Sequence, residues 1–183
     1  SIPVVASFKE QIDIFVDKHT WYCTLTYFMT FGTFAGMAAA FPMMIKSLYV
    51  PLDGELDPLK FAFYGPLIGS ATRVVFGKIA DKTGGAILTH ITGIALIILF
   101  AALIFGGFLT PTSMDQFPYF VGIVMLIFFF TGIGNAATFK QFPMIFSDSP
   151  RKAAGVIGWT AAIAAFGPFV FNVLISTSKS MSG

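Results

Sequence analysis

The sequence contains few charged residues and a single cysteine. Of its 183 residues, 11% are charged and 56% are hydrophobic, whereas a typical globular protein has roughly 25% charged residues. The 11 basic and 9 acidic residues give a net charge of +2, which provides no basic stripe of the kind that nucleic acid requires. The lone Cys23 excludes an internal disulfide framework and a cysteine-rich metal site. The absence of a basic stripe excludes nucleic acid as a partner.

The first twenty residues resemble neither a complete N-terminus nor a signal peptide. The chain begins with Ser1, and residues 1–20 lack a basic region followed by an apolar region and a cleavage site. We therefore expect the chain to be cut from a longer protein. Apolar and charged positions alternate in residues 1–20, which is typical of an amphipathic helix in a membrane interface. We interpret this segment as a cytoplasmic linker.

Long apolar stretches dominate the rest of the chain. A helix that crosses a bilayer needs about 20 predominantly apolar residues. The stretches that match are residues 21–45, 59–79, 86–110, 119–146 and 153–176. They predict an all-α polytopic membrane protein with about five transmembrane helices, bundled over residues 21–176. Five helices would leave the end of the chain on the face opposite to its start, so we expect one helix of a six-helix unit to be missing after the polar tail, residues 177–183.

The basic residues predict the orientation of these helices. Cytoplasmic loops carry an excess of Lys and Arg. One set of alternating loops holds Lys9, Lys18, Lys78, Lys82, Arg151 and Lys152, with Lys140 nearby, and the other holds Lys46, Lys60 and Lys179 beside four acidic residues. The N-terminus and the DKTGG loop are therefore predicted to be cytoplasmic.

Arg73 is the most informative residue. It lies eight positions before Asp81, or roughly 12 Å along a helix, which places it close to the bilayer midplane. A central Arg costs roughly 2.5 to 3.5 kcal/mol even on lenient insertion scales, and it cannot lose its proton. No acidic residue lies inside the five stretches. We interpret Arg73 as an anion-binding residue; the alternative is an Arg that snorkels to the interface or bonds to backbone carbonyls.

Other spans carry patterns that packing alone can explain. Tyr27, Phe31, Phe34 and Ala38 form one stripe on the first span, and Gly132, Ala136, Phe139, Lys140 and Pro143 share a stripe on the fourth. The pair Gly132 and Ala136 favours close helix contact. Lys140 either snorkels inward or adds charge to an anion path, and we favour snorkelling. Pro168 predicts a bend in the fifth span.

Four segments together carry a resemblance to a known family. GKIADKTGG, residues 77–85, resembles the cytoplasmic loop motif of a major facilitator repeat. Together with GPLIGSATRVV, TGIGNAATFKQFPMIF and GWTAAIAAFGPF, it makes the chain from His19 onward resemble the nitrate/nitrite porter family. The resemblance implies helices seven to eleven of a twelve-helix transporter, within its C-terminal half. An Ala-rich last signature containing Pro168 departs from the family pattern.

The resemblance also implies site residues. Arg73 takes the position of the arginine that grips a planar anion together with a partner from the other half. Tyr27 and Phe31 match positions whose hydroxyl and ring contact the anion. Gly134 and Ala161 lie in the signature segments that flank the substrate. The expected conformational-switch loop contains Gly77, Asp81 and Gly84.

These observations predict a secondary transporter of nitrate and nitrite in the inner, cytoplasmic membrane, with no cofactor, metal or covalent step. Its expected partners are the two anions, the lipid bilayer, the missing N-terminal six-helix half and the last helix. Nitrate/nitrite exchange by alternating access is the favoured mechanism, because no span contains an acid that could carry a proton. The alternatives are a proton-coupled nitrate symporter, a facilitator for another small anion, and a structural or haem-bearing membrane anchor. His19 and His90 lie near predicted helix starts, which disfavours a haem role.

Overall fold

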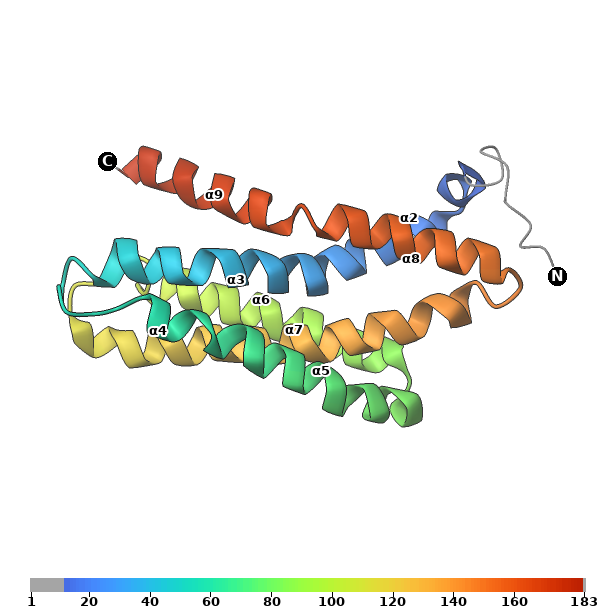
Figure 1. Ribbon diagram of the computed structural model, residues 1–183, viewed down its shortest axis with the longest axis horizontal. Helices are drawn as coiled ribbons and strands as arrows, with labels where there is room; N and C mark the ends of the chain where they lie inside the picture. Colours follow the sequence, from blue (N-terminus) through green and yellow to red (C-terminus); the bar gives the residue numbers. More distant parts are fainter. Residues whose placement is uncertain (1–11, 183) are drawn as a thin grey trace.

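The computed structural model describes residues 12–182; the side chains of Ile175 and of residues 178–182 are not described. The helices run roughly along one long axis (Figure 1), and no strand occurs within residues 12–182. The elements are η1 Asp13–Val16, α2 Lys18–Tyr27, η2 Phe28–Gly32, α3 Thr33–Met44, η3 Ile45–Tyr49, α4 Leu59–Ala62, α5 Tyr64–Thr83, α6 Gly85–Phe105, η4 Met114–Gln116, α7 Phe117–Ile145, α8 Pro150–Ala164 and α9 Gly167–Ser182. The all-α prediction is confirmed.

Four helical stretches in the described part are long and apolar enough to cross a membrane. They are Lys18–Tyr49, Gly85–Phe105, Met114–Ile145 and Pro150–Leu174. The remaining predicted span, residues 59–79, is also helical, as α4 and α5. It is more polar than the other four because α5 contains Arg73 and ends in the charged sequence ADKT. That this fifth helix crosses the membrane therefore stays a prediction.

Successive connections lie at opposite ends of the bundle. The start of the described chain, the α5–α6 turn and the α7–α8 connection lie at one end, and the α3–α4 and α6–α7 connections lie at the other (Figure 1). This arrangement confirms the two alternating sets of loops that the basic residues predicted. Which end faces the cytoplasm stays a prediction.

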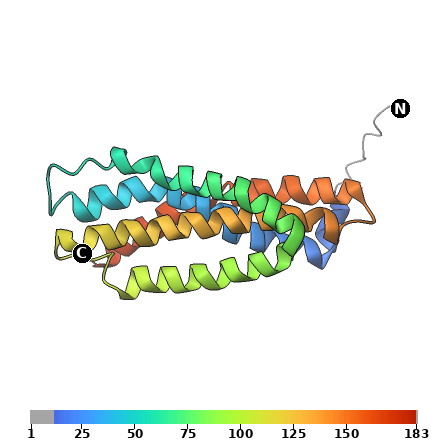
Figure 2. The ribbon, with the colours of Figure 1, turned by 90° about the horizontal axis from the view of Figure 1, so that it is seen from below.

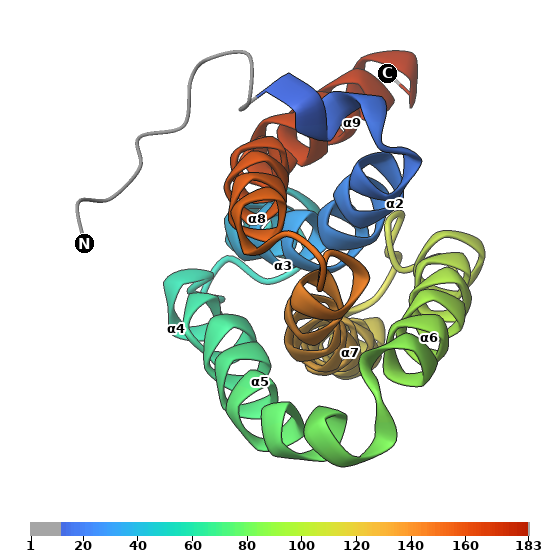
Figure 3. The same ribbon diagram turned by 90° about the vertical axis from the view of Figure 1, so that its right-hand side faces the viewer.

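Helix α7 occupies the middle of the bundle, with α5 and α6 on either side (Figure 2, Figure 3). The α5–α7 contact depends on glycine: a Cβ on Gly132 would lie 2.4 Å from the carbonyl oxygen of Gly69. The α6–α7 contact is equally close, because a Cβ on Gly85 would lie 2.4 Å from the carbonyl oxygen of Ala137. The close contact predicted for Gly132 is confirmed.

The last predicted span is broken rather than gently bent. Helix α8 ends at Ala164, and α9 begins at Gly167. Pro168 explains the break because it has no N–H to donate to the carbonyl of Ala164 four residues earlier. Gly167 passes close to η2, since a Cβ there would lie 2.2 Å from the carbonyl oxygen of Gly32. Helix α9 then continues through Ser182, so the described part of the predicted tail is helical.

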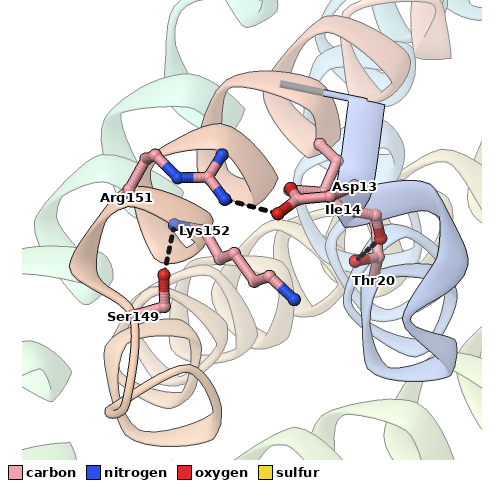
Figure 4. A network of polar contacts seen from close by, with 6 residues as sticks. All are labelled: Asp13, Ile14, Thr20, Ser149, Arg151 and Lys152. Atoms are coloured by element: carbon pink, nitrogen blue, oxygen red, sulfur yellow. Dashed lines mark hydrogen bonds and ion pairs between the residues drawn. The ribbon is translucent and has the colours of Figure 1, made fainter. Parts of the chain in front are cut away.

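The described part of the predicted linker folds back onto α8. Asp13 accepts a hydrogen bond from Arg151, and Thr20 Oγ1 donates to the Ile14 carbonyl at 2.5 Å (Figure 4). The hydrogen bond from Arg151 holds the pKa of Asp13 below its usual value, although burial opposes the shift. The prediction of a single amphipathic helix is wrong for residues 12–20, because the backbone at Asp17 is extended. The Asp17 carboxylate caps α2 by accepting a hydrogen bond from the His19 N–H. Residues 1–11 lie outside the described part.

We predict that Gly132→Ala destabilises the protein by roughly 1 to 3 kcal/mol, the usual effect of overpacking a close contact. The new methyl group would force α5 and α7 apart at Gly69. Gly122→Ala is the matched control: it lies on the same helix and its Cβ would touch nothing within 4 Å, so the higher helix propensity of Ala should leave stability unchanged or slightly raised. Thermal unfolding in detergent measures both. Equal unfolding temperatures for the two variants would contradict the packing described above.

Candidate functional site

Arg73 lies roughly halfway along the 20-residue helix α5. Its side chain is exposed in this chain, and its guanidinium carbon lies over the ring of Phe139, 5.0 Å from the ring centroid. This distance is within the range of a cation–π contact. Because Phe139 belongs to the central helix α7, the Arg73 side chain is directed toward the bundle rather than away from it.

The Phe139 ring joins Arg73 to a row of aromatic side chains. Tyr27 meets Phe139 edge-on, with ring centroids 5.1 Å apart, and stacks on Phe31 at 5.4 Å with an interplanar angle of 3°. Phe31 in turn stacks on Phe34 at 6.1 Å. The first-span stripe therefore forms a continuous wall along α2, η2 and α3. At the Tyr27 end, this wall meets Phe139, the residue whose ring contacts Arg73.

Arg73 has no acidic counter-charge in the described part of the chain. The ion pairs in that part are Lys140 with Asp81 and Arg151 with Asp13, and neither includes Arg73. Tyr27 is buried, with 3% of its surface exposed, and its hydroxyl makes no hydrogen bond to another described residue. A fixed positive charge and a buried phenol thus both contact the Phe139 ring, and neither has a polar partner within the described residues.

The structure brings some of the other predicted site residues to this place and not others. Ala161 packs against the hydrophobic cluster that contains Tyr27 and Phe139. Gly134 does not join them, because a Cβ there would lie 2.5 Å from Thr30 Cγ2 and 2.7 Å from Thr92 Cγ2. Five residues separate Gly134 from Phe139, which turns it about 140° around the helix. Gly134 therefore serves close packing between α7, η2 and α6.

Two glycines near Arg73 differ in what they do. Gly69 and Gly77 lie four residues before and after Arg73 on α5, where the absence of a side chain can leave room beside the guanidinium. Gly69 leaves none, because a Cβ there would lie 2.6 Å from the Phe34 ring. A Cβ on Gly77 would meet nothing within 4 Å, so the room beside this part of α5 lies at Gly77 alone.

The predicted switch residues lie beyond Arg73 along α5. Asp81 forms an ion pair with Lys140 of α7, and both side chains are about half exposed, at 55% and 44%. Gly84 ends the helix with a φ of 82°, a conformation that favours glycine. The Lys140 ammonium is therefore held about two helical turns away from Arg73, which favours the snorkelling interpretation over a role in the anion path.

Phe139 contacts Arg73, although the sequence pattern assigns it only to the fourth-span stripe, which packing alone can explain. The preference of Arg for an aromatic face was the signal that could have found it. Elsewhere, a groove of about 390 Å³ is lined by α2, α6 and α7 residues, including Thr26, His90 and Gln141, and Arg73 does not line it. Within residues 12–182, no three His, Cys, Asp or Glu side chains gather into a possible metal site.

The fold and the site define the class of protein, an all-α polytopic membrane protein with an Arg halfway along one helix. No family model matches the chain. It is 52% identical over 183 residues to the probable nitrate/nitrite antiporter NarK2 of Thermus thermophilus, an alignment covering 100% of this chain and 40% of the relative. It is 31% identical over 197 residues to the nitrate/nitrite transporter NarU of Escherichia coli strain K12, covering 97% of this chain and 41% of the relative. A nitrite extrusion protein of Bacillus subtilis is 27% identical over 168 residues, with 90% and 40% covered.

These comparisons confirm the resemblance to the nitrate/nitrite porter family: the chain is homologous, over its whole length, to part of these transporters. It spans about two fifths of the length of the curated relatives it matches. That share is consistent with the predicted C-terminal half.

We predict that Asp81 and Lys140 stabilise the α5–α7 contact modestly. A double-mutant cycle with Asp81→Asn and Lys140→Gln should give a coupling free energy of about 0.2 to 1 kcal/mol, because exposed ion pairs contribute little. Salt screens such pairs, so the coupling should fall between low and high ionic strength. Chemical or thermal denaturation in detergent measures it. A coupling of zero at low salt would show that the two side chains do not interact.

Proposed function

We propose that this chain forms one half of a nitrate/nitrite transporter and that Arg73 binds the transported anion. One observation supports this most strongly: a guanidinium halfway along a helix contacts an aromatic ring and has no carboxylate partner within residues 12–182. Keeping such a charge in a membrane is costly unless a polar cavity or an anion compensates it. A bound anion provides the missing counter-charge.

The chemistry of the guanidinium suits a planar oxyanion. The Arg73 guanidinium contacts the Phe139 ring, and its five N–H donors lie in one plane. Two parallel N–H donors match two oxygens of a planar anion such as nitrate or nitrite. The hydroxyl of Tyr27, whose ring also contacts Phe139, can donate one further hydrogen bond. Tyr27 and Phe31 therefore stay in the proposed site with Arg73, and Ala161 borders it.

A second bundle is needed to complete this site. Arg73 is exposed in this chain, and five helices do not enclose a pathway. In transporters built from repeats, the substrate lies near the bilayer midplane between the two halves. We place the N-terminal six-helix half and the last helix against this face, in an inner membrane with the N-terminal end of the chain cytoplasmic. The second half would supply the other arginine of the clamp.

The switch residues lie where helix ends meet rather than at the anion. Asp81 and Lys140 tie the ends of α5 and α7 together, and Gly84 allows the turn into α6. We assign this loop, with Gly77, the role of holding one access state. Rocking one bundle against the other would break and remake such contacts.

Anion exchange follows from the fixed charge. None of the five helices contains an Asp or Glu near its middle that could carry a proton. An empty site would leave Arg73 and its partner uncompensated in a low dielectric, so the empty carrier should reorient reluctantly. An anion bound from either side removes this penalty.

We predict that Arg73→Lys in the complete transporter weakens nitrate binding roughly 10- to 100-fold, because an ammonium keeps the charge and loses the two-pronged hydrogen bonding. Arg151→Lys, the same substitution at the other arginine of the chain, is the matched control and should transport normally. Uptake of labelled nitrate into proteoliposomes measures both. Near-normal uptake by the Arg73 variant would refute the anion-binding role.

We also predict obligatory exchange. Proteoliposomes holding the complete protein should take up labelled nitrate only when nitrite or nitrate is inside, with little response to an imposed pH gradient. A formate-loaded arm tests whether another small planar anion is exchanged as well. Strong accumulation driven by the pH gradient into anion-free vesicles would establish proton symport in place of exchange.

A further inference from the structure

Asn135 carries a buried polar atom that nothing in the described chain satisfies. It lies on the central helix α7 and exposes 2% of its surface. Its Oδ1 atom has no hydrogen-bond partner, and the other such atom in the described part is Asp13 Oδ1, at the end of the bundle. Asp13 already pairs through its second oxygen with Arg151. Because an unsatisfied buried amide is destabilising, its presence in the middle of the bundle calls for a function.

The position of Asn135 on α7 places it beside the proposed site. It precedes Phe139 by four residues, so the two side chains lie about 40° apart around the helix. Gly132, on one side, faces α5, where a Cβ would meet the carbonyl oxygen of Gly69 and Cβ of Thr72. Thr138, on the other side, reaches Thr30 of η2 at 3.5 Å. Asn135 therefore lies between the side of α7 that contacts α5 and the side that contacts η2.

Two polar side chains, Arg73 and Tyr27, contact the Phe139 ring, and Asn135 lies about one helical turn before Phe139 on α7. Their polar groups are the Arg73 guanidinium, the Tyr27 hydroxyl and the Asn135 carboxamide, from α5, α2 and α7. None of them makes a hydrogen bond to another residue of the described part. The hydroxyl groups that face the other side of α7 behave differently, since Thr138 donates to the Gly134 carbonyl at 2.9 Å. Unpaired groups are therefore concentrated on the side of α7 that carries Phe139.

We propose that Asn135 is a further anion-binding residue that discriminates nitrate from nitrite. This inference rests on the proposed function. The Asn135 Nδ2 group donates to an oxygen of the bound anion, and Oδ1 accepts an N–H of the Arg73 guanidinium, which satisfies both ends of the amide. An amide suits this place because it has both donors and an acceptor. A lysine could not fill both roles, because an ammonium group has no acceptor.

The discrimination follows from the number of oxygens. When two oxygens of a planar anion are held by guanidinium N–H groups, nitrate has a third oxygen left for the amide, and nitrite has none. Removing the Asn135 amide should therefore weaken nitrate binding more than nitrite binding. A residue that merely packs would change both affinities equally or neither.

The test is Asn135→Leu in the complete transporter, which keeps the branched shape of four side-chain heavy atoms and removes both polar ends. We expect nitrate affinity to fall about tenfold or more, as for loss of a hydrogen bond to a charged group, and nitrite affinity to change clearly less. The unfolding temperature without anion should stay the same or rise, because a buried unsatisfied group is removed. Thr138→Val is the matched control: it removes a buried polar group from the same helix on the side facing η2, and both affinities should stay at wild-type values. Anion-dependent thermal shifts with nitrate and with nitrite measure all of these.

The outcomes separate this inference from the proposed function. If the wild-type protein shows no shift with either anion, the proposed function fails, and this inference fails with it. If the wild-type protein binds nitrate and Asn135→Leu binds both anions as the wild type does, this inference alone is overturned. If Asn135→Leu does not fold, Asn135→Asp serves as the second variant, because it keeps the size and the acceptor oxygen and removes both N–H donors. It should lose nitrate binding at neutral pH, and wild-type nitrate affinity in that variant would equally overturn the inference.

Discussion

The rest of the structure depends on how the charge of Arg73 is accommodated. A guanidinium keeps its charge at any ordinary pH, and a membrane interior gives it almost no solvation. The chain offers it an aromatic face at Phe139, no carboxylate within the described residues, and an open side. A protein that pairs a midplane Arg permanently would neutralise it. Leaving the charge available is what a binding site for an anion requires.

Close packing between helices makes this arrangement possible. The contact of Gly132 with Gly69 brings α5 against α7, so that Arg73 can reach the Phe139 ring. Farther along the same two helices, Asp81 and Lys140 make an ion pair. Phe139, which contacts Arg73, and Lys140, which pairs with Asp81, are neighbouring residues of α7. They connect the proposed anion site to the end of the bundle where a change of access would act. Motion of α7 relative to α5 would therefore be felt at both places.

The apolar stretches and the position of Arg73 halfway along its helix could be predicted from the sequence, because they depend on composition and spacing alone. The close contact at Gly132 was predictable for a similar reason, since small residues four apart favour helix association. Which neighbour each side chain meets was not predictable. Gly134 lies in the same segment as Phe139 and yet faces Thr30 and Thr92, and the Phe34 ring fills the space beside Gly69. The contact of Phe139 with Arg73 and the unsatisfied amide of Asn135, on which the proposed site rests, become visible only when α2, α5 and α7 are placed together.

A structure of the complete transporter with nitrate bound tests the central claim most directly. The account predicts the anion at the interface of the two bundles, with its oxygens about 2.7 to 2.9 Å from the Arg73 guanidinium nitrogens, the distance of a charge-assisted hydrogen bond. Phe139 should still lie against the guanidinium. An Arg73 side chain directed to lipid, or paired with a carboxylate of the other half while nitrate binds elsewhere, would contradict the account.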